Sequence, residues 1–206
     1  MRVNPFADIL AFLTAPSYHE PFFMVVIFWL VALGSLVVAF RAYQSVPGQK
    51  SPRHLARWFA RFVVGAMWWQ QAQWKFPTDI GGLRYWTGQI IEHAAFPIHG
   101  QFFEAVVLPY FLPFAYLVYV IEMTVAVSLL LGLFVRAGGI VGGLFILNLW
   151  FGLYRSPEEW PWTYVFLVLL MFLFVVERYG RSLGADALLS ADDDKRARRS
   201  RVAAFT

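Results

Sequence analysis

The sequence predicts an all-α integral membrane protein, a helical bundle embedded in a lipid bilayer. Of its 206 residues, 59% are hydrophobic and 15% are charged, whereas a soluble domain is about 45–50% apolar and about 25% charged. The apolar residues gather in runs close to the roughly 20 residues that a helix needs to cross the hydrocarbon core. The length suits one compact bundle rather than several domains.

Five apolar runs are predicted to cross the membrane as helices. They are Pro21–Phe40, Leu55–Trp74, Leu112–Phe134, Ala137–Tyr154 and Trp160–Val176. The first run contains no charge, and no convincing cleavage site follows it, so we expect a retained helix rather than a signal peptide. The second run is the least regular, because it contains arginines and glutamines.

The segments outside the spans have distinct characters. Residues 1–20 form an N-terminal interfacial segment, and the connection from 75 to 109 mixes apolar, aromatic and charged residues, as expected of a segment structured on the membrane surface. Residues 190–206 form a basic, solvated tail. Four apolar residues suggest a short interfacial helix in the first segment: Phe6, Ile9, Leu10 and Leu13.

The basic residues predict the orientation. If the loop after the first span is cytoplasmic, 13 of the 17 Lys and Arg residues lie inside. The four that lie outside are Arg2, Lys75, Arg84 and Arg155. Cytoplasmic loops of membrane proteins carry an excess of positive charge. We therefore expect the N-terminus outside and the C-terminus in the cytoplasm.

Several kinds of chemistry are excluded or disfavoured. The chain has no cysteine, which excludes disulfides, iron–sulfur clusters and c-type haem attachment. No histidine lies in a predicted span, so a haem held by two histidines in the bilayer is not expected, and no flavin motif is present. His93 and His99 share the outer connection with Asp79, Glu92 and Glu104, but their spacing matches no strong metal pattern. The basic residues flank apolar runs, which disfavours nucleic acid as a partner.

Glu122 is the most informative residue, because it lies near the middle of the third predicted span. A carboxylate there costs about 2.5–3.5 kcal/mol on insertion scales, so it should face protein or a water pocket. It could bind a proton or a quinol headgroup, or it could be a buried carboxyl satisfied by a neighbouring helix. Gln70, Gln71 and Asn148 fall within about two helical turns of its level. Such a polar cluster could bind a quinone carbonyl, although bonds between helices, worth about 0.6 kcal/mol each, are commoner.

Two helix patterns indicate packing. Arg61, Trp68 and Lys75 recur every seven residues and therefore share one stripe of the second span. We expect Arg61 to extend to lipid headgroups and Lys75 to mark the outer end of the span. Four glycines in the fourth span permit close helix approach, either within the chain or in an oligomer: Gly138, Gly139, Gly142 and Gly143.

A series of motifs follows in order along most of the chain. The segments are Arg61–Gly65, Gln73–Pro77, Leu83–Trp86, Val107–Pro109, Leu129–Arg136, Glu159–Tyr164 and Gly180–Asp186. Together they resemble the DoxD/DoxX family, which includes the membrane subunit of thiosulfate:quinone oxidoreductase. The resemblance implies a four-helix membrane domain over residues 55–189, with residues 21–40 as one extra N-terminal transmembrane helix. It also implies the cytoplasmic (inner) membrane of a bacterium or archaeon.

The function implied by this resemblance is a subunit that couples oxidation of a small sulfur anion to reduction of membrane quinone. Glu122, Lys75 and Arg84 are the candidate catalytic residues, the two cations to attract the anion. The candidate quinone-binding residues are Gln70, Gln71, Asn148 and Trp74. Partners besides lipid would be other subunits of a membrane complex or further copies of the chain.

A rival interpretation is a non-catalytic accessory subunit of a larger respiratory or photosynthetic complex, because the chain contains no electron carrier of its own. A transporter is disfavoured, because five spans without an internal repeat do not suggest alternating access. The sequence leaves open whether the chain is itself an enzyme.

Overall fold

The computed structural model describes residues 4–15, 21–75 and 81–196, and within these ranges the chain forms nine α-helices and no strand. The α-helices are α1 (Pro5–Thr14), α2 (Phe22–Ser45), α3 (Pro52–Gln73), α4 (Gly81–His93), α5 (Pro97–Phe102), α6 (Phe111–Leu131), α7 (Val135–Gly152), α8 (Pro161–Val176) and α9 (Ala185–Arg196). A π-helical turn, η1 (Phe103–Val107), lies between α5 and α6, and a 3-10 turn, η2 (Tyr179–Arg181), lies between α8 and α9. The all-α prediction is confirmed.

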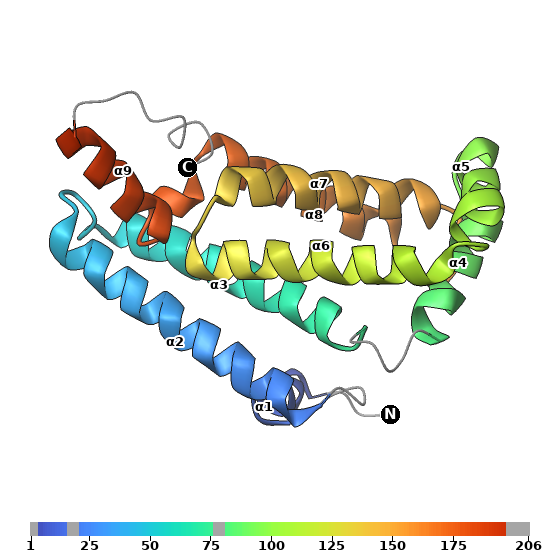
Figure 1. The fold of residues 1–206 in the computed structure, drawn as a ribbon, viewed down its shortest axis with the longest axis horizontal. Helices are drawn as coiled ribbons and strands as arrows, with labels where there is room; N and C mark the ends of the chain where they lie inside the picture. Colours follow the sequence, from blue (N-terminus) through green and yellow to red (C-terminus); the bar gives the residue numbers. More distant parts are fainter. Residues whose placement is uncertain (1–3, 16–20, 76–80, 197–206) are drawn as a thin grey trace.

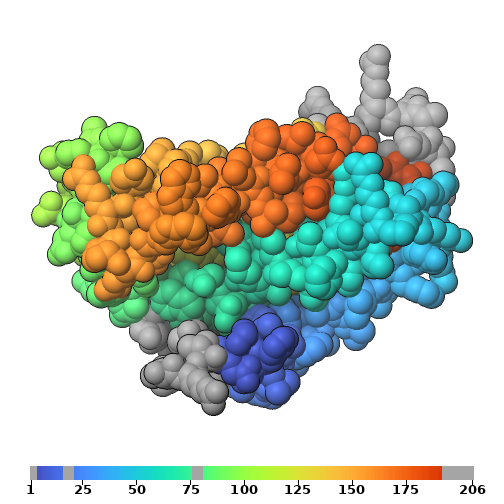
Figure 2. Space-filling view, turned by 180° about the vertical axis from the view of Figure 1, so that it is seen from behind, coloured from blue at the N-terminus to red at the C-terminus, as the bar shows by residue number. Residues whose placement is uncertain are grey.

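Four antiparallel helices, α3, α6, α7 and α8, form the bundle (Figure 1). Helix α2 crosses its outside, in contact with α6, α3 and α9. Helices α4 and α5 cover one end, which we call the α4 end, while α9 and the α2–α3 turn occupy the α9 end (Figure 1). On the opposite face, α8 and α3 form the surface and α2 borders α3 (Figure 2).

Three helices, α2, α6 and α7, are long and apolar enough to cross a membrane. The chain is therefore a multi-pass membrane protein. The other two predicted spans do not reach this standard by length and composition. Helix α3 carries three arginines and several glutamines, and α8, although apolar, has 16 residues.

The outward faces of the helices agree with this assignment. Leu30, Leu144 and Phe172 are 62%, 63% and 59% exposed, and each belongs to a different helix. Soluble monomers rarely expose large contiguous apolar patches. These side chains are placed to contact lipid.

The helix bounds differ from the predicted ones where local geometry decides them. Helix α2 extends to Ser45 because its last turns pack on the α9 end, with Ala42 completely buried beside Leu183. Helix α6 ends at Leu131 because Gly132 adopts the left-handed conformation, with φ of 69°. The expected N-terminal helix forms as α1, and the connection that follows α3 contains α4, α5 and η1.

Helices α3 and α6 approach closely at Gly65. A Cβ atom there would lie 2.9 Å from the backbone nitrogen of Leu130 and 3.1 Å from the Cβ of Leu129. Since the nearest atom belongs to a helix backbone, it cannot move aside as a flexible side chain can. Gly65 therefore sets the distance between the two helices.

Arg61 differs from its predicted position. It is completely buried, and its guanidinium donates hydrogen bonds to the carbonyls of Leu129 and Leu130 in the last turn of α6. The expectation that it extends to headgroups is wrong, because Arg61 shares the stripe of Trp68 and Lys75, and this stripe faces α6. The positive charge there complements the negative end of the α6 dipole.

Asp186 fixes the start of α7 from a distant part of the chain. Its carboxylate accepts hydrogen bonds from the backbone N–H groups of Phe134 (2.7 Å) and Val135 (3.1 Å), and its own N–H donates to the carbonyl of Gly132 (2.8 Å). A helix start has unpaired N–H groups that such an oxygen satisfies. The Gly180–Asp186 motif therefore serves the scaffold.

The glycines of α7 contact helices of the same chain. A Cβ at Gly139 would lie 2.7 Å from a methyl carbon of Val175, and one at Gly142 would lie 2.5 Å from the Met171 methyl carbon. Both neighbours belong to α8. The prediction that these glycines permit close helix packing is confirmed within the bundle.

We expect Gly65→Ala to lower the free energy of unfolding in detergent by about 1–3 kcal/mol, because the added methyl group has no space and forces α3 away from α6. The matched control is Gly88→Ala in α4, where nothing lies within 4 Å of the new Cβ. This control should be neutral or stabilising by up to about 1 kcal/mol, because alanine favours a helix. Equal effects of the two substitutions would contradict the close contact.

We expect Asp186→Ala to lower the free energy of unfolding by about 0.5–2 kcal/mol, because the helix cap is lost. A further loss is expected because the buried Arg61 no longer has the compensating charge of Asp186. Asp186→Asn keeps an acceptor oxygen and should be milder. Denaturant unfolding followed by circular dichroism measures both. Asp8→Ala, at an exposed position in α1, should stay within about 0.5 kcal/mol of the unaltered chain. A result for Asp186→Ala within that same range would contradict the cap.

Candidate functional site

A cavity of about 530 Å³ lies in the α4 half of the bundle, lined by residues of α3, α4, α6, α7 and α8 and of the α5–η1 segment. Most of its lining is apolar or aromatic. Six of the aromatic residues are Trp68, Trp74, Trp86, Phe114, Phe145 and Tyr164. This volume falls within the range of about 300–1,000 Å³ that is usual for small-molecule sites.

The cover of the cavity is tied to the rest of the bundle by hydrogen bonds. Tyr85 of α4 donates to Glu158, before α8, at 2.6 Å, and the N–H of Arg155 donates to the carbonyl of His93 at 3.0 Å. The bond to Glu158 raises the pKa of the Tyr85 hydroxyl, because it stabilises the protonated phenol beside a carboxylate. These contacts hold α4 over the end of the bundle.

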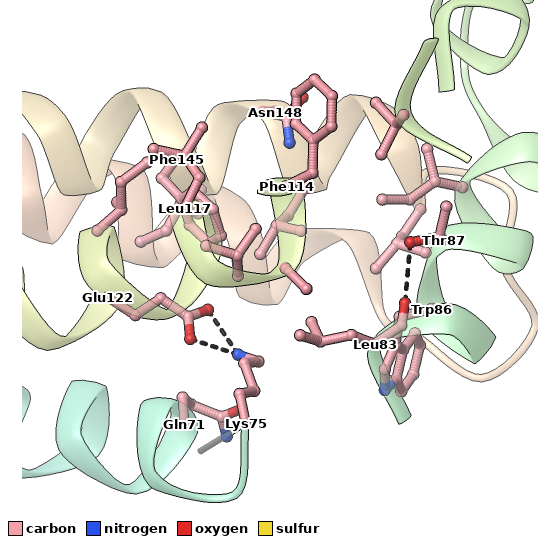
Figure 3. A pocket seen from close by; sticks show the side chains of 18 of the residues that line it. Gln71, Lys75, Leu83, Trp86, Thr87, Phe114, Leu117, Glu122, Phe145 and Asn148 are labelled. Carbon is pink, nitrogen blue, oxygen red and sulfur yellow. Dashed lines mark hydrogen bonds and ion pairs between the residues drawn. The ribbon is translucent and has the colours of Figure 1, made fainter. Parts of the chain in front are cut away.

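Lys75 and Glu122 form a buried ion pair on the cavity wall. The Lys75 Nζ lies 2.6 Å from Oε1 and 2.5 Å from Oε2 of Glu122, and the two side chains are 8% and 4% exposed (Figure 3). The same Nζ lies 4.8 Å from the ring centroid of Trp74. Removing either partner would leave a buried charge without its counter-ion, which is costly.

Further polar side chains line the same cavity. Gln71 belongs to the last turn of α3 and precedes Lys75 by about one turn, whereas Asn148 belongs to α7 (Figure 3). The amide oxygen of Asn148 accepts a hydrogen bond from His99 Nε2 at 3.0 Å. Glu159 and Thr163 line the cavity near the start of α8. The site thus combines an aromatic interior with polar groups from several helices.

The structure brings together most of the residues expected at the site. Glu122, Lys75, Gln71, Trp74 and Asn148 all line the cavity.

The two remaining candidates lie elsewhere. Gln70 is half-buried on a different face of α3 from Gln71 and does not line the cavity. Arg84 is exposed, and its guanidinium lies 4.7 Å from the ring centroid of Phe111, outside the cavity lining.

Lys75 lies deeper than its sequence position suggested. We expected it at the outer surface, but its side chain turns back into the bundle because the turn that follows α3 presents it to Glu122 of α6. Of the two alternatives for Glu122, the buried carboxyl satisfied by a neighbouring segment is confirmed, and the bound ligand stays a prediction. Its carboxylate is satisfied by a neighbouring segment, and it lies on the wall of a cavity large enough for a ligand.

His99, Glu159 and Tyr164 were missed as site residues. The contact of His99 with Asn148 joins residues 49 positions apart, and no periodic pattern signals such a contact. For Tyr164, the motif Glu159–Tyr164 was a signal, because it belongs to the series that resembles the DoxD/DoxX family, but it assigned no role to this residue.

A metal site finds no support in the part of the chain that the structure describes, where no three His, Asp or Glu residues form a cluster. His93 Nδ1 lies 3.1 Å from the carbonyl of Gln89, and His99 contacts Asn148. Asp79, considered with these histidines from the sequence, lies outside the described residues.

No family model matches the chain, and neither a curated protein nor a solved structure matches it. The likeness to the DoxD/DoxX family therefore depends on the sequence motifs alone.

We expect Lys75→Met and Glu122→Leu each to lower the free energy of unfolding by about 3–5 kcal/mol, because each leaves one buried charge unpaired. The double variant should lose much less than the sum, since an apolar pair of similar volume removes both charges. Denaturant unfolding in detergent of the unaltered chain, the two single variants and the double variant gives the coupling free energy between the two side chains. Lys50→Met, at an exposed lysine, is the control and should change stability by less than about 0.5 kcal/mol. Strictly additive effects would contradict a buried pair.

Proposed function

We propose that the chain is a quinone-binding membrane subunit of the thiosulfate:quinone oxidoreductase type, which couples oxidation of a small sulfur anion to reduction of membrane quinone. The observation that carries the proposal is the Lys75–Glu122 ion pair on the wall of an aromatic cavity. The motifs that resemble the DoxD/DoxX family support it independently.

The cavity suits a quinone headgroup chemically. A quinone ring is flat and apolar on both faces, and its carbonyl oxygens accept hydrogen bonds. Trp68, Trp74 and Phe145 offer aromatic surface to the ring, and the Lys75 ammonium offers a donor to one carbonyl. A few polar groups in a largely apolar pocket are the usual means by which a protein orients a small molecule.

The ion pair also supplies the proton chemistry that the reaction needs. Conversion of a quinone to a quinol consumes two electrons and two protons, and the electrons come from the sulfur anion, which is oxidised as the quinone is reduced. The Lys75 ammonium holds an exchangeable proton at the cavity wall, and the Glu122 carboxylate stabilises the protonated amine. A positioned acid of this kind is the usual means of proton delivery.

The proposed topology places this chemistry at the outer face of the membrane. We propose that α3 and α8 cross the bilayer together with α2, α6 and α7, with the N-terminus outside and the C-terminus in the cytoplasm. Their antiparallel order puts Arg53, Arg57, Arg136, Arg178 and Arg181 at the α9 end, as the excess of positive charge inside requires. Arg84 and Arg155 at the α4 end would then attract the anion.

We expect the purified chain to bind a short-chain quinone, seen as quenching of tryptophan fluorescence, because three tryptophans line the cavity. Lys75→Met should weaken binding at least about tenfold, because a hydrogen bond to a charged group is worth about 1.5 kcal/mol or more. Glu122→Gln should weaken binding in the same direction, because it removes the carboxylate that holds the Lys75 ammonium in place. Glu104→Gln is the matched control, because Glu104 is an exposed carboxylate at the same end that does not line the cavity.

Turnover is then measured as quinone reduction with thiosulfate as the donor, by the chain alone and with any co-purifying partners. Loss of turnover in Glu122→Gln, with Glu104→Gln unaffected, would support the proposal. Absence of quinone binding in the unaltered protein, together with a stoichiometric larger complex, would instead make the chain an accessory subunit of that complex.

A further inference from the structure

The second wall of the cavity suggests how a quinone would be held at both ends. The two carbonyl groups of a para-quinone point in opposite directions, so a site that binds both needs polar partners on two facing walls. Lys75 and Glu122 lie on the α3–α6 wall. Asn148, on α7, points into the same space from the other side (Figure 3).

We propose that His99 is a positioning residue that orients the Asn148 amide to bind the second carbonyl of the quinone. The cavity would thereby select ligands with two opposed carbonyl groups. This inference rests on the proposed function, since it concerns the same cavity.

The hydrogen bond between the two side chains determines the direction of the amide. His99 Nε2 lies 3.0 Å from the Asn148 Oδ1. An amide oxygen only accepts, so His99 must carry a proton on Nε2. With its oxygen bound to His99, the amide directs its NH₂ group elsewhere. Figure 3 shows this nitrogen turned toward the cavity, where it can donate to a carbonyl oxygen.

His99 is itself held in place by its neighbours in α5, η1 and α4. Its ring lies edge-on to the ring of Phe103, with centroids 5.1 Å apart and planes at 76°. The next residue, Gly100, is buried where a Cβ would lie 2.8 Å from the carbonyl oxygen of Ile91 in α4. The position of α5 is therefore fixed by close contact with α4. A binding group is effective when its supporting residues are locked in this way.

The competing explanation is that the His99–Asn148 bond only joins α5 to α7, as bonds between membrane helices often do. The two explanations differ in ligand selectivity. A purely structural bond affects every ligand of the cavity equally. An oriented amide donor affects only a ligand that offers a second carbonyl.

The experiment uses isothermal titration calorimetry of the full chain in detergent with two probes. The probes are 1,4-naphthoquinone, which has two opposed carbonyl groups, and 1-tetralone, which has a similar ring system and one carbonyl. The variants are Asn148→Leu, His99→Leu and His99→Gln. The matched control is His93→Leu, because His93 belongs to α4, its ring Nδ1 contacts the Gln89 carbonyl of the same helix, and it does not line the cavity.

We expect the unaltered chain and His93→Leu to prefer the naphthoquinone about tenfold, as one additional hydrogen bond provides. Asn148→Leu and His99→Leu should lose this preference through weaker naphthoquinone binding, with tetralone binding unchanged. His99→Gln should restore much of the preference, because the glutamine amide can donate to Asn148. Unchanged tetralone binding also reports that the cavity is intact in each variant.

Three results would overturn the inference. A retained preference in Asn148→Leu would show that the amide does not bind the second carbonyl. An equal loss for both probes in His99→Leu would show that the bond only supports the fold. If the unaltered chain binds neither probe, the proposed function fails first and the inference fails with it. Should His99→Leu not fold, Asn148→Leu alone decides, because it removes the proposed donor directly.

Discussion

The contact between α3 and α6 is the constraint on which the rest of the structure depends. Gly65 lets the two backbones approach, Arg61 binds the last carbonyls of α6, and Lys75 pairs with Glu122 nearer the other end of the contact. The interface is therefore fixed by close packing at one point and by a buried cation on each side of it. Since α7 continues from α6 through a short turn, the position of α7 and its partner α8 follows from this contact.

The two buried cations, Arg61 on α3 and Lys75 just after it, have different consequences because their partners differ. Arg61 faces backbone carbonyls, whose partial charges cannot titrate or leave, so it contributes to a permanent scaffold. Lys75 faces a carboxylate beside open space, so a ligand can share its hydrogen-bonding capacity. Two repeats of the seven-residue spacing therefore separate a cation that belongs to the framework from a cation that can bind a ligand in the cavity.

The sequence predicted the helical class, the general positions of the helices and the shared stripe of Arg61, Trp68 and Lys75, because these depend on local apolar runs and helix periodicity. It did not predict the burial of Arg61, since a cation near a membrane surface is equally compatible with extension to headgroups. It also did not separate Gln71 from Gln70, because neighbours on a helix face different directions and the direction depends on packing. The roles of His99 and Asp186 depend on contacts between distant segments, which no local pattern records.

The scaffold and the cavity occupy opposite ends of the bundle, and this separation affects what a family resemblance can mean. The Gly180–Asp186 motif and Arg61 belong to the α9 end, where they join α6, α7 and α9 without touching the cavity. Lys75 and Glu122 belong to the other end and hold no helix terminus. A chain could therefore keep every α9-end contact, and with it this fold, while replacing the ion pair and its chemistry. The motifs that resemble the DoxD/DoxX family are divided between the two ends. Arg61 and the Gly180–Asp186 motif serve the α9 end, whereas Lys75 and the Glu159–Tyr164 motif lie at the cavity. A resemblance in fold therefore does not settle the activity, which must be argued from the cavity.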